Sequence, residues 1–345
     1  MRPDMIRTDR RTLLAGLTAT ALAPRAAIAE PPLPLWRRRP VARPSGNAPY
    51  LMPDGRIRIV GTDIMRNLIE AWNHRFAGAH PGFAFDLQMR PGLMAIGPAA
   101  YGITPFAPMP RRFTREELAS FRTIAGRDPV VVRVAHGSVV ARDRTAVLAI
   151  YVHRANPIRH LTMDQVGAIF STGHPGGDIS CWGQLGLGGE WAARPIHPVG
   201  TPLDAGFGSY LSEEKMGGRP LSPSMTIRAI SSEVMAVVGG DIGAIGYAAI
   251  NFANDSTREL PIGVGADGPW LTGTAADVMA GRYALDRFIY LYALPRPDGT
   301  LDDWIEDYFQ LALSREGQAL VAAETDSFLP LLAGNPGSDR GWGRE

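Results

Sequence analysis

Glycine-containing turns that also carry a hydroxyl group occur at two places where a predicted strand ends. Gly61-Thr62-Asp63-Ile64 follows a strand predicted for residues 56–60 and precedes a helical segment, and His136-Gly137-Ser138 follows a strand predicted for residues 130–135. A helix start carries unpaired N–H groups and about half a positive charge, so it attracts anions. Ligands of open α/β sheets bind beyond the carboxyl ends of the strands. The turns therefore predict a site for a small anion; an ordinary helix cap at the first and a surface turn at the second are the structural alternatives.

Sequence motifs of catalysis are missing. The chain has no Gly-x-Ser-x-Gly elbow, no His-Glu-x-x-His and no P-loop. Cys181-Trp182 superficially resembles a cysteine-protease nucleophile, with His174 or His197 as its base, but a buried apolar cysteine beside a core tryptophan is the simpler interpretation. The seven histidines lack ligand spacing, and the single cysteine excludes a disulfide and a cysteine-rich zinc site. We therefore expect no enzymatic activity, no cofactor and no metal.

Length and composition describe a soluble globular protein with two domains or lobes. The chain has 345 residues, of which 45% are hydrophobic and 20% charged, and its formal net charge is +1. This balance gives no indication of nucleic acid or a membrane surface as a partner. The basic residues are almost all arginine, with Lys215 as the only lysine. A surface that grasps phosphate would explain this bias, but the scattered positions favour genomic base composition.

The N-terminal segment is predicted to precede the folded part of the protein. Residues 1–29 have the order of an export signal, with the twin-arginine pattern Thr8–Leu14, a mildly apolar run and the small-residue motif Ala27-Ile28-Ala29. The apolar run is about half the ~20 residues that span a bilayer, which argues against a retained anchor. Residues 30–54 carry seven prolines and three consecutive arginines, a composition that predicts an extended linker. We expect export to the periplasm by the twin-arginine route.

Hydrophobic periodicity predicts alternating strands and helices. The apolar run Ala146–Val152 is typical of a strand buried on both faces, and Asn156-Pro157 ends it. Thr162 then stands three residues before Gln165, the spacing of a capping box, and begins a helix. We interpret this strand and helix as half of a βαβ unit. The other predictions are strands at residues 56–60, 83–89, 130–135, 195–199, 244–250 and 282–294, and helices at 64–76, at 114–124, from about 207, and within 301–323.

Three segments occur in an order that is specific to one family. They are Leu161–Phe170 with its glycine-rich loop to Trp182, then Asp241–Tyr247, then Tyr283–Tyr292 followed by Ser314–Gln318. In this order they resemble the periplasmic phosphate-binding proteins of ABC transporters, over roughly residues 56–332. The resemblance implies an α/β, two-lobed periplasmic binding protein type II fold with mixed sheets flanked by helices, a hinge between the lobes and the ligand in the cleft. The implied parts are lobe I (residues 55–144 and 285–333), lobe II (145–284) and a flexible tail (334–345).

The resemblance places the ligand on a handful of loops, which have lost most of their polar side chains in this chain. The family's Gly-Ser-Asp-Thr corresponds to Gly61–Ile64, and its Gly-Ser-Ser-Thr corresponds to Pro91–Met94. Pro108–Arg111 keeps the family's arginine but loses its serine, and Gly200–Phe207 lacks the arginine, serine and threonine of Gly-Arg-x-x-x-Ser-Gly-Thr. The predicted ligand-binding residues are Thr62, Asp63, Ile64, Met109, Arg111, Gly137, Ser138, Thr201, Gly206 and Phe207.

These replacements argue against tight binding of inorganic phosphate. Each hydrogen bond to a charged group contributes roughly 1.5–3 kcal/mol, and the loops lack an arginine and about five hydroxyls of the family pattern. Asp63 and Asp204 would oppose a dianion further if both face the cleft. Thr62, Ser138 and Arg111 are the polar groups expected to orient a ligand. A drier pocket for a partly apolar solute would be lined by Ile64, Leu93, Met94, Met109 and Phe207.

Two functions stay open from the sequence. The first is an extracytoplasmic, non-catalytic solute-binding protein of an ABC transporter, which captures a phosphate-like anion or a more apolar molecule in the interlobe cleft. The second is a binding-protein scaffold that acts as a sensor or protein-interaction module without a small-molecule ligand. The expected partners are the ligand and a transporter permease or a membrane receptor, and we expect a monomer.

Overall fold

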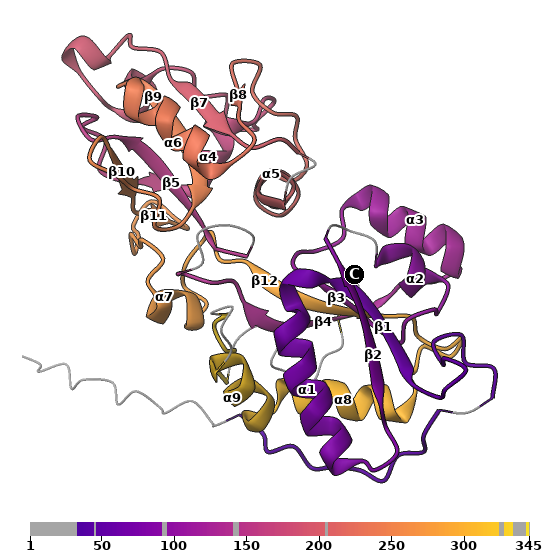
Figure 1. Cartoon of the computed structure of the whole chain (residues 1–345). Helices are drawn as coiled ribbons and strands as arrows, with labels where there is room; N and C mark the ends of the chain where they lie inside the picture. The colour runs from indigo at the N-terminus through magenta and orange to yellow at the C-terminus, as the bar shows by residue number, and fades with distance from the viewer. Residues whose placement is uncertain are drawn as a thin grey trace, which may run out of the picture. The chain divides into compact units, whose positions relative to one another are not determined.

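The computed structural model describes residues 33–44, 46–91, 95–140, 145–203, 206–323 and 328–333, and the backbone of 343–344 (Figure 1). Several predictions lie outside the described residues: the signal segment, the loop residues 92–94, residues 204–205 and most of the tail.

The first hydrophobic core, which we call core I, is built on two sheets. Its strands are β1 (Ile57–Thr62), β2 (Phe85–Arg90), β3 (Ala107–Met109), β4 (Val130–His136), β12 (Phe288–Ala293) and β13 (Gly343–Arg344). β1 and β2 pair in parallel, and the other four strands form one sheet in the order β13-β4-β12-β3. β12 runs antiparallel to both of its neighbours, so the C-terminal part of the chain supplies a central strand of this sheet.

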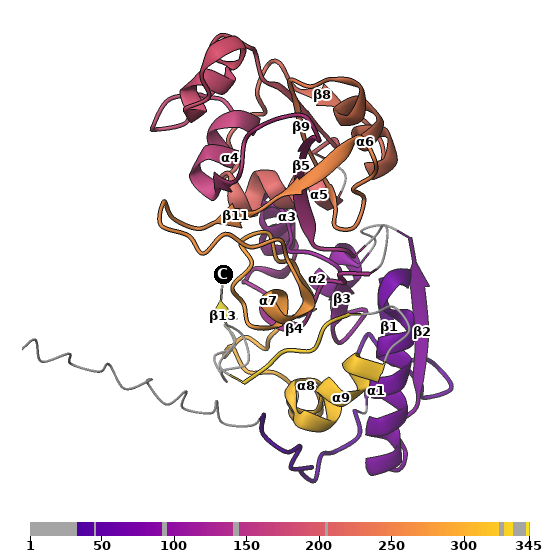
Figure 2. The same ribbon diagram turned by 90° about the vertical axis from the view of Figure 1, so that its left-hand side faces the viewer.

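Two groups of helices accompany these strands. The helices η1 (Asp63–Met65), α1 (Arg66–Ala79), α8 (Asp303–Leu313) and α9 (Arg315–Ala323) pack against core I, whereas α2 (Ile96–Ala100) and α3 (Arg115–Ala125) pack in a separate cluster with Met109, Phe113 and Tyr292. α1 lies beside α8 and α9 in both views (Figures 1 and 2). The predicted apolar face of α1 is confirmed for Leu68, Trp72 and Phe76, which are fully buried, whereas Ile64 precedes the helix and is only partly buried. The 3.6-residue period thus located the buried face of α1 correctly.

The predicted helix cap at Thr62 is wrong in detail. β1 continues through Thr62, and a 3₁₀ turn, η1, separates the strand from α1. The Thr62 side chain makes no hydrogen bond to the first N–H groups of the turn; it is buried, with Oγ1 3.5 Å from Oδ1 of Asp63. The hydroxyl is therefore not the capping group that its position before an apolar helix suggests.

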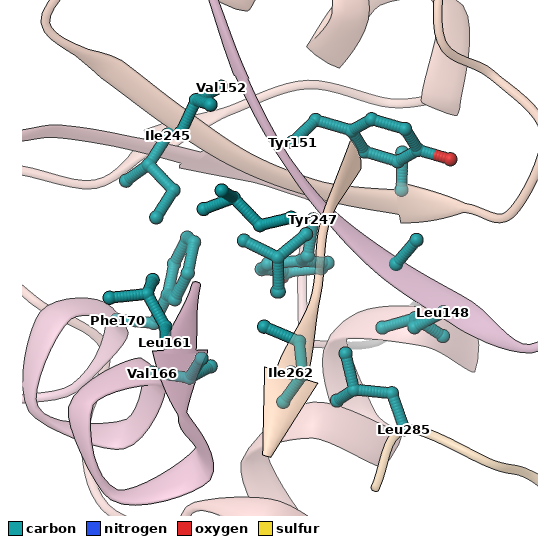
Figure 3. Packing of buried hydrophobic residues seen from close by; sticks show 14 of the residues in the cluster. Leu148, Tyr151, Val152, Leu161, Val166, Phe170, Ile245, Tyr247, Ile262 and Leu285 are labelled. Atoms are coloured by element: carbon teal, nitrogen blue, oxygen red, sulfur yellow. The ribbon is translucent and has the colours of Figure 1, made fainter. Parts of the chain in front are cut away.

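The second hydrophobic core, core II, surrounds a five-stranded sheet. Its strands are β5 (Leu148–His153), β7 (His197–Gly200), β8 (Thr226–Ile227), β9 (Ala244–Ala249) and β10 (Thr257–Leu260), in the order β10-β5-β9-β7-β8, and a separate short pair joins β6 (Leu161–Thr162) to β11 (Ile262–Gly263). Figure 3 shows Tyr151, Ile245 and Phe170 among the side chains packed in this core. The first five residues of β5 are fully buried, as the apolar run predicted.

The interpretation of β5 as half of a parallel βαβ unit is wrong. β5 runs antiparallel to both of its neighbours, β9 and β10. The parallel pairs of this sheet are β7 with β8 and β7 with β9. A fully apolar strand shows that both faces are covered, but it does not fix the direction of the neighbouring strands.

A capping box begins the first helix of core II. The helices of this region are α4 (Met163–Phe170), η2 (Trp182–Leu185), η3 (Gly189–Trp191), α5 (Gly206–Tyr210), η4 (Leu211–Lys215), α6 (Ser231–Gly240) and α7 (Ala275–Met279). At the start of α4, Thr162 Oγ1 accepts a hydrogen bond from the Gln165 N–H at 3.1 Å, and Gln165 Oε1 accepts one from the Thr162 N–H at 2.9 Å. The predicted box is confirmed.

Removing the capping hydroxyl gives a first testable prediction. We expect Thr162→Ala to lower the free energy of unfolding by about 1 kcal/mol, because it leaves one N–H group of α4 without its partner. Urea denaturation measures the change. Thr123→Ala is the control, since Thr123 lies on the exposed side of α3 and bonds only to the Ala119 carbonyl. Equal stability of the two variants would contradict a capping role for Thr162.

The predicted long strand from residue 282 to 294 is wrong in its first half. β12 begins only at Phe288, and the preceding residues belong to the other core: Tyr283 and Leu285 are buried in core II. The Tyr283 hydroxyl donates to the Leu148 carbonyl at 2.8 Å, and the Leu148 N–H donates to the Leu285 carbonyl at 3.3 Å. The chain therefore passes from core II to core I at residues 286–287, where a regular strand would have to change sheets.

The proline- and arginine-rich segment is anchored to core I. Trp36 is 8% exposed and stacks on Phe76, with ring centroids 6.0 Å apart. Its Nε1 donates to Oδ1 of Asp307 at 3.3 Å, and the Tyr50 hydroxyl donates to Asp302 at 2.7 Å. Residues 33–44 form no helix or strand, as expected, but the tryptophan fixes them to the folded part.

Candidate functional site

A cavity of about 490 Å³ lies where segments of both cores meet. Four parts of the chain line it: residues 111–118 around the start of α3, Arg133 of β4, residues 209–215 of α5 and η4, and the passage at residues 286–288. The lining residues are Arg111, Arg112, Phe113, Thr114, Arg115, Leu118, Arg133, Ser209, Tyr210, Glu213, Glu214, Lys215, Asp286 and Phe288. Its volume falls within the range of small-molecule sites.

Charged side chains dominate the lining. Five are basic and three are acidic, so the lining carries a formal excess of positive charge; they are Arg111, Arg112, Arg115, Arg133 and Lys215, and Glu213, Glu214 and Asp286. Positive charge concentrated in a concave surface raises the local concentration of anions. The electrostatics therefore favour a small anion as the ligand.

The loop before α3 is held in place by aromatic stacking and a buried ion pair. The Phe113 ring stacks on Tyr292 of β12 at 3.8 Å, and the Tyr292 hydroxyl accepts a hydrogen bond from the Phe113 N–H at 3.0 Å. Arg111 donates to both carboxylate oxygens of Glu117, at 2.7 and 2.8 Å. Glu117 is also the capping-box residue of α3. Since Arg111 is nearly buried and bound in this bidentate way, much of its charge is already neutralised.

Ion pairs connect the start of α3 to η4. Arg115 lies 3.3 Å from Glu213, and its Nη2 donates to the Gly217 carbonyl at 2.7 Å. Arg112 lies 3.8 Å from Glu214. η4 is a π-helical segment, and Met216 and two glycines follow it. Gly217 and Gly218 have left-handed φ angles of 64° and 70°, and a Cβ on Gly218 would lie 2.6 Å from the Arg115 guanidinium. The left-handed φ angle favours glycine at this position.

Lys215 is a largely buried cation without an acidic partner in direct contact. Its Nζ lies 5.4 Å from the centroid of the Tyr210 ring, and no carboxylate of the described residues lies within ion-pair distance of it. Burial lowers the pKa of Lys215, while Glu214 and Asp286 act in the opposite direction. Burial also disfavours the charged form of Glu214 and so raises its pKa. A buried ammonium of this kind gains from an anion that enters the cavity.

Asp286 is bound on one side only. Its Oδ2 lies 2.7 Å from Nδ1 of the fully buried His136, and its side chain is 6% exposed. Burial raises the pKa of Asp286, and the hydrogen bond to His136 opposes that rise. The other oxygen, Oδ1, has no hydrogen-bond partner among the described residues. Buried carboxylate oxygens without a partner are costly and are often completed by water or a ligand.

Arg287 is a second buried cation beside the cavity. It is 2% exposed, and its guanidinium carbon lies 4.9 Å and 5.4 Å from the ring centroids of Phe207 and Tyr210. It donates to the carbonyls of Ala146 and Gly206, at 3.2 and 3.4 Å, and its Nε is unpartnered within the described part of the chain. Burial lowers the pKa of Arg287. The guanidinium fixes the start of α5 to the passage between the cores.

Of the ten predicted ligand-binding residues, Arg111 lines the cavity. Met109 is buried in β3, and Ile64 packs against core I. Ser138 is fully buried, and its Oγ accepts a hydrogen bond from the Val140 N–H at 3.0 Å. Gly137 donates its N–H to the Arg287 carbonyl at 2.7 Å, in the passage between the cores.

Three predicted residues belong to the segment 201–207, which leads into α5 and includes its first two residues. Gly206 and Phe207 contact Arg287, as described above. Thr201 is buried, its carbonyl accepts a hydrogen bond from the Tyr247 hydroxyl at 2.6 Å, and its Oγ1 has no partner in the described ranges. Thr62 and Asp63 lie at the end of β1.

Sequence reasoning missed the charged residues that line the cavity beyond Arg111. Arg112 and Arg133 gave no signal, because arginines are scattered along the whole chain. Lys215 did give one: it is the only lysine, and it lies in the cavity. Asp286 lies within the strand predicted for residues 282–294 and could not be distinguished from a surface acid.

Two further features bear on the class of site. Within the described ranges, no three metal-ligating side chains are grouped closely enough to hold a metal ion. No helix of the described part combines the length and apolarity needed to cross a bilayer.

Comparison with known proteins finds relatives along nearly the whole chain. The family model for the PBP superfamily domain matches residues 46–316. The phosphate-binding protein PstS of Pseudomonas aeruginosa is 29% identical over 330 residues, which cover 94% of this chain and 95% of that protein.

Solved structures share the fold. The crystal structure of an ABC-type phosphate transport receptor from Vibrio cholerae has a TM-score of 0.54 at 17% identity and covers 80% of this chain and 99% of that one. The crystal structure of PstS from Borrelia burgdorferi has a TM-score of 0.53 at 15% identity, with 79% and 98% covered. The predicted fold class, with mixed sheets flanked by helices as in type II periplasmic binding proteins, is confirmed. Because the family model matches well over half of the chain, this protein belongs to the PBP superfamily.

Proposed function

We propose that this protein is the solute-binding component of an ABC transporter and captures a small anion in the charged cavity. The observation that carries the proposal is the cavity itself, in which five basic side chains face three acidic ones between segments of both cores. The relatives support the same role: one is named a phosphate-binding protein, and another is described as a phosphate transport receptor. Membership of this family also favours a non-catalytic role.

Weak binding of inorganic phosphate is part of the proposal. The one arginine kept from the family pattern, Arg111, is engaged by Glu117. Thr201 stands where the family has its loop arginine, and its side chain is too short to supply a charged donor. A dianion in the cavity would also lie near Glu214 and Asp286. In an organic anion with two charges, carbon atoms separate the charges, so only one of them needs to lie near these carboxylates. We therefore expect monoanions and organic anions to bind better than inorganic phosphate.

The two cores support a division into two lobes. We propose that residues 55–144 with 285–333 form one lobe, that 145–284 form the other, and that the passage at residues 286–287 belongs to the hinge. The buried residues of core II run from Ala146 to Leu285, and those of core I lie on both sides of this range. Closure about such a hinge would bring the start of α3 toward η4.

Extracytoplasmic location and a membrane partner complete the proposal. The twin-arginine pattern of residues 8–14 and the following apolar run support export to the periplasm by that route. A transporter permease is the expected partner, and we expect a monomer in solution.

Calorimetry on the mature chain tests the proposal. We expect phosphate, sulfate and small carboxylates to bind with measurable heat, and Arg133→Gln to weaken the binding of every anion at least roughly tenfold, because one hydrogen bond to a charged group contributes roughly 1.5–3 kcal/mol. The control is Arg122→Gln, which removes the same charge from α3; Arg122 is half-exposed and pairs with Asp128 outside the cavity.

A role without a ligand is the second candidate, and the ion pairs favour it. Arg111, Arg112 and Arg115 each have an acidic partner, which reduces the charge offered to a ligand. A thermal-shift screen discriminates between the two, because a ligand at 100 times its Kd stabilises the protein by about 2.7 kcal/mol. If no anion produces heat or a thermal shift, the solute-binding proposal is wrong and the scaffold role is favoured.

A further inference from the structure

Lys215 and Asp286 are two charged residues of opposite sign that line the cavity. Each has a polar atom that lacks a direct partner of opposite charge or a hydrogen-bond partner. Lys215 Nζ contacts the Tyr210 ring and forms no ion pair within the described part of the chain. Asp286 Oδ1 has no hydrogen-bond partner there, and the Asp286 side chain is 94% buried. Both residues line the same cavity, although they are separated by 71 positions in the sequence.

Lys215 and Asp286 influence each other electrostatically but do not pair. Each shifts the pKa of the other toward the charged form, so they lie within range of one another's fields. Lys215 and Asp286 nevertheless form no direct ion pair with each other in the described part of the chain; the ion pair of Asp286 is with His136. A group that fits between them must present an acceptor to the ammonium and a donor to the carboxylate oxygen.

An anion without a donor satisfies only one of the two. Its negative charge would approach Lys215 and at the same time be repelled by the Asp286 carboxylate. An anion that carries a hydroxyl next to its charged group can donate to Asp286 Oδ1 while its carboxylate accepts from Lys215. The chemistry of the two residues therefore selects for a donor beside the charge. Hydrogen phosphate also carries such a donor, so the size of the cavity has to distinguish it from an organic anion.

The size of the cavity favours an organic ligand. Liquid water occupies about 30 Å³ per molecule, so a cavity of about 490 Å³ has room for on the order of fifteen waters. A tetrahedral inorganic oxyanion has the bulk of only a few waters and would leave most of this space wet. Carbon atoms of a larger ligand would fill it beside Phe113, Leu118 and Phe288, which contribute the apolar part of the lining.

We propose that the cavity binds small organic anions that carry a hydrogen-bond donor next to the charged group, with 2-hydroxycarboxylates as the simplest members. Lys215 holds the charge, and Asp286, positioned by His136, accepts the hydrogen bond from the neighbouring hydroxyl. This inference rests on the proposed solute-binding function and specifies the class of its ligand.

Matched ligands test the donor directly. Malate and succinate have the same carbon skeleton and the same two carboxylates, and they differ by one hydroxyl. In titration calorimetry of the mature chain at pH 7.5, we expect one enantiomer of malate to bind roughly ten- to a hundredfold more tightly than succinate, because a hydrogen bond to a charged acceptor is gained. We expect the same enantiomer to bind more tightly than inorganic phosphate.

A pair of carboxylate-to-amide variants locates the acceptor. Asp286→Asn keeps the shape of the side chain; its amide oxygen can still face His136, which leaves an NH₂ group where the acceptor was. We expect the preference for malate over succinate to disappear in this variant. Glu213→Gln is the matched control: it removes the same charge from the same cavity, but Glu213 is already paired with Arg115, so the preference should persist.

The single lysine provides a readout that does not depend on the variants folding. An amine-acylating reagent modifies Lys215 and the N-terminal amine, and mass spectrometry of the peptides separates the two. We expect malate to protect Lys215 from acylation at concentrations at which succinate does not. Such protection in the wild-type protein supports the inference even if Asp286→Asn fails to fold.

The outcomes separate this inference from the proposed function. Equal affinity for malate and succinate, or tighter binding of inorganic phosphate than of malate, would overturn the inference while anion binding stands. A preference for malate that survives Asp286→Asn would overturn the role of Asp286. Absence of binding by every anion, with no protection of Lys215, would overturn the proposed function together with the inference.

Discussion

Replacing Glu259 with glutamine is expected to stabilise the protein by several kcal/mol at pH 8.5 and to change its stability little at pH 4.5. Glu259 lies on β10 opposite Tyr151 of β5. Burial raises the pKa of its carboxyl from 4.5 to about 8, and its Oε1 has no hydrogen-bond partner in the described part of the chain. A charge at this position is therefore strongly disfavoured in the folded state.

The pH window of the effect follows from the two pKa values of Glu259. Below pH 4.5 the carboxyl is protonated in both the folded and the unfolded chain, so it contributes no difference. Between pH 4.5 and about 8 the unfolded chain releases the proton while the folded chain retains it, which favours unfolding by about 1.4 kcal/mol for each pH unit. Above about pH 8 both states are ionised and the full difference persists. Glutamine has no proton to release, so the stability of the variant does not fall with pH for this reason.

Urea denaturation of wild type and Glu259→Gln at both pH values measures the difference. The comparison between variants is needed because Glu214 and Asp286, whose pKa values are also raised by burial, contribute to the pH dependence of the wild type. The neighbouring Tyr151 and Tyr283 have raised pKa values and stay protonated in this window. Glu190→Gln is the control, since Glu190 is 75% exposed. A stability gain that is the same at pH 4.5 and 8.5 would contradict the titration of Glu259.

Truncating Trp36 is expected to lower the free energy of unfolding by about 3–5 kcal/mol, the usual cost of removing a large buried aromatic side chain. Trp36 is 92% buried, stacks on Phe76 and carries the Arg75 guanidinium 4.8 Å from its ring centroid. Trp36→Ala would leave a cavity against core I and remove the hydrogen bond from Nε1 to Asp307. Thermal and urea denaturation of the wild type and the variant measure the loss.

The neighbouring residue supplies the control for Trp36. Leu35 is 57% exposed, and Leu35→Ala should change the stability by no more than about 0.5 kcal/mol. If Trp36→Ala is as stable as Leu35→Ala, the segment before β1 is an unattached linker, as its composition first indicated. A large loss instead establishes that the folded unit begins before residue 46, where the family match starts.

Most of the elements could be predicted because their signals are local. The capping box of Thr162 and Gln165, the buried run of β5 and the apolar face of α1 each depend on residues a few positions apart. The anchoring of Trp36 could not be predicted in this way. Its partners, Phe76 and Asp307, are separated from it by 40 and 271 positions in the sequence. The surrounding prolines suggested a segment without tertiary contacts.

The direction of β5 and the start of β12 show a second limit of prediction from the sequence. Hydrophobic pattern reports how much of a strand is covered, and the pattern of β5 was read correctly on that point. It does not report which strand lies alongside, so β5 turned out to be antiparallel to its neighbours. The chain passes from core II to core I between Tyr283 and Ile289, and apolar and aromatic side chains occur on both sides of this change. A local hydrophobic pattern therefore cannot reveal it.

The sequence by itself indicated the family and the alternation of buried strands and helices. Only the tertiary structure decided which charges meet. It neutralised Arg111 with Glu117, and it brought Lys215 to the cavity that Asp286 lines. The physical reason is that burial and capping are governed by neighbours within one or two turns, whereas the partner of a charge depends on distances between segments that only the packed chain defines.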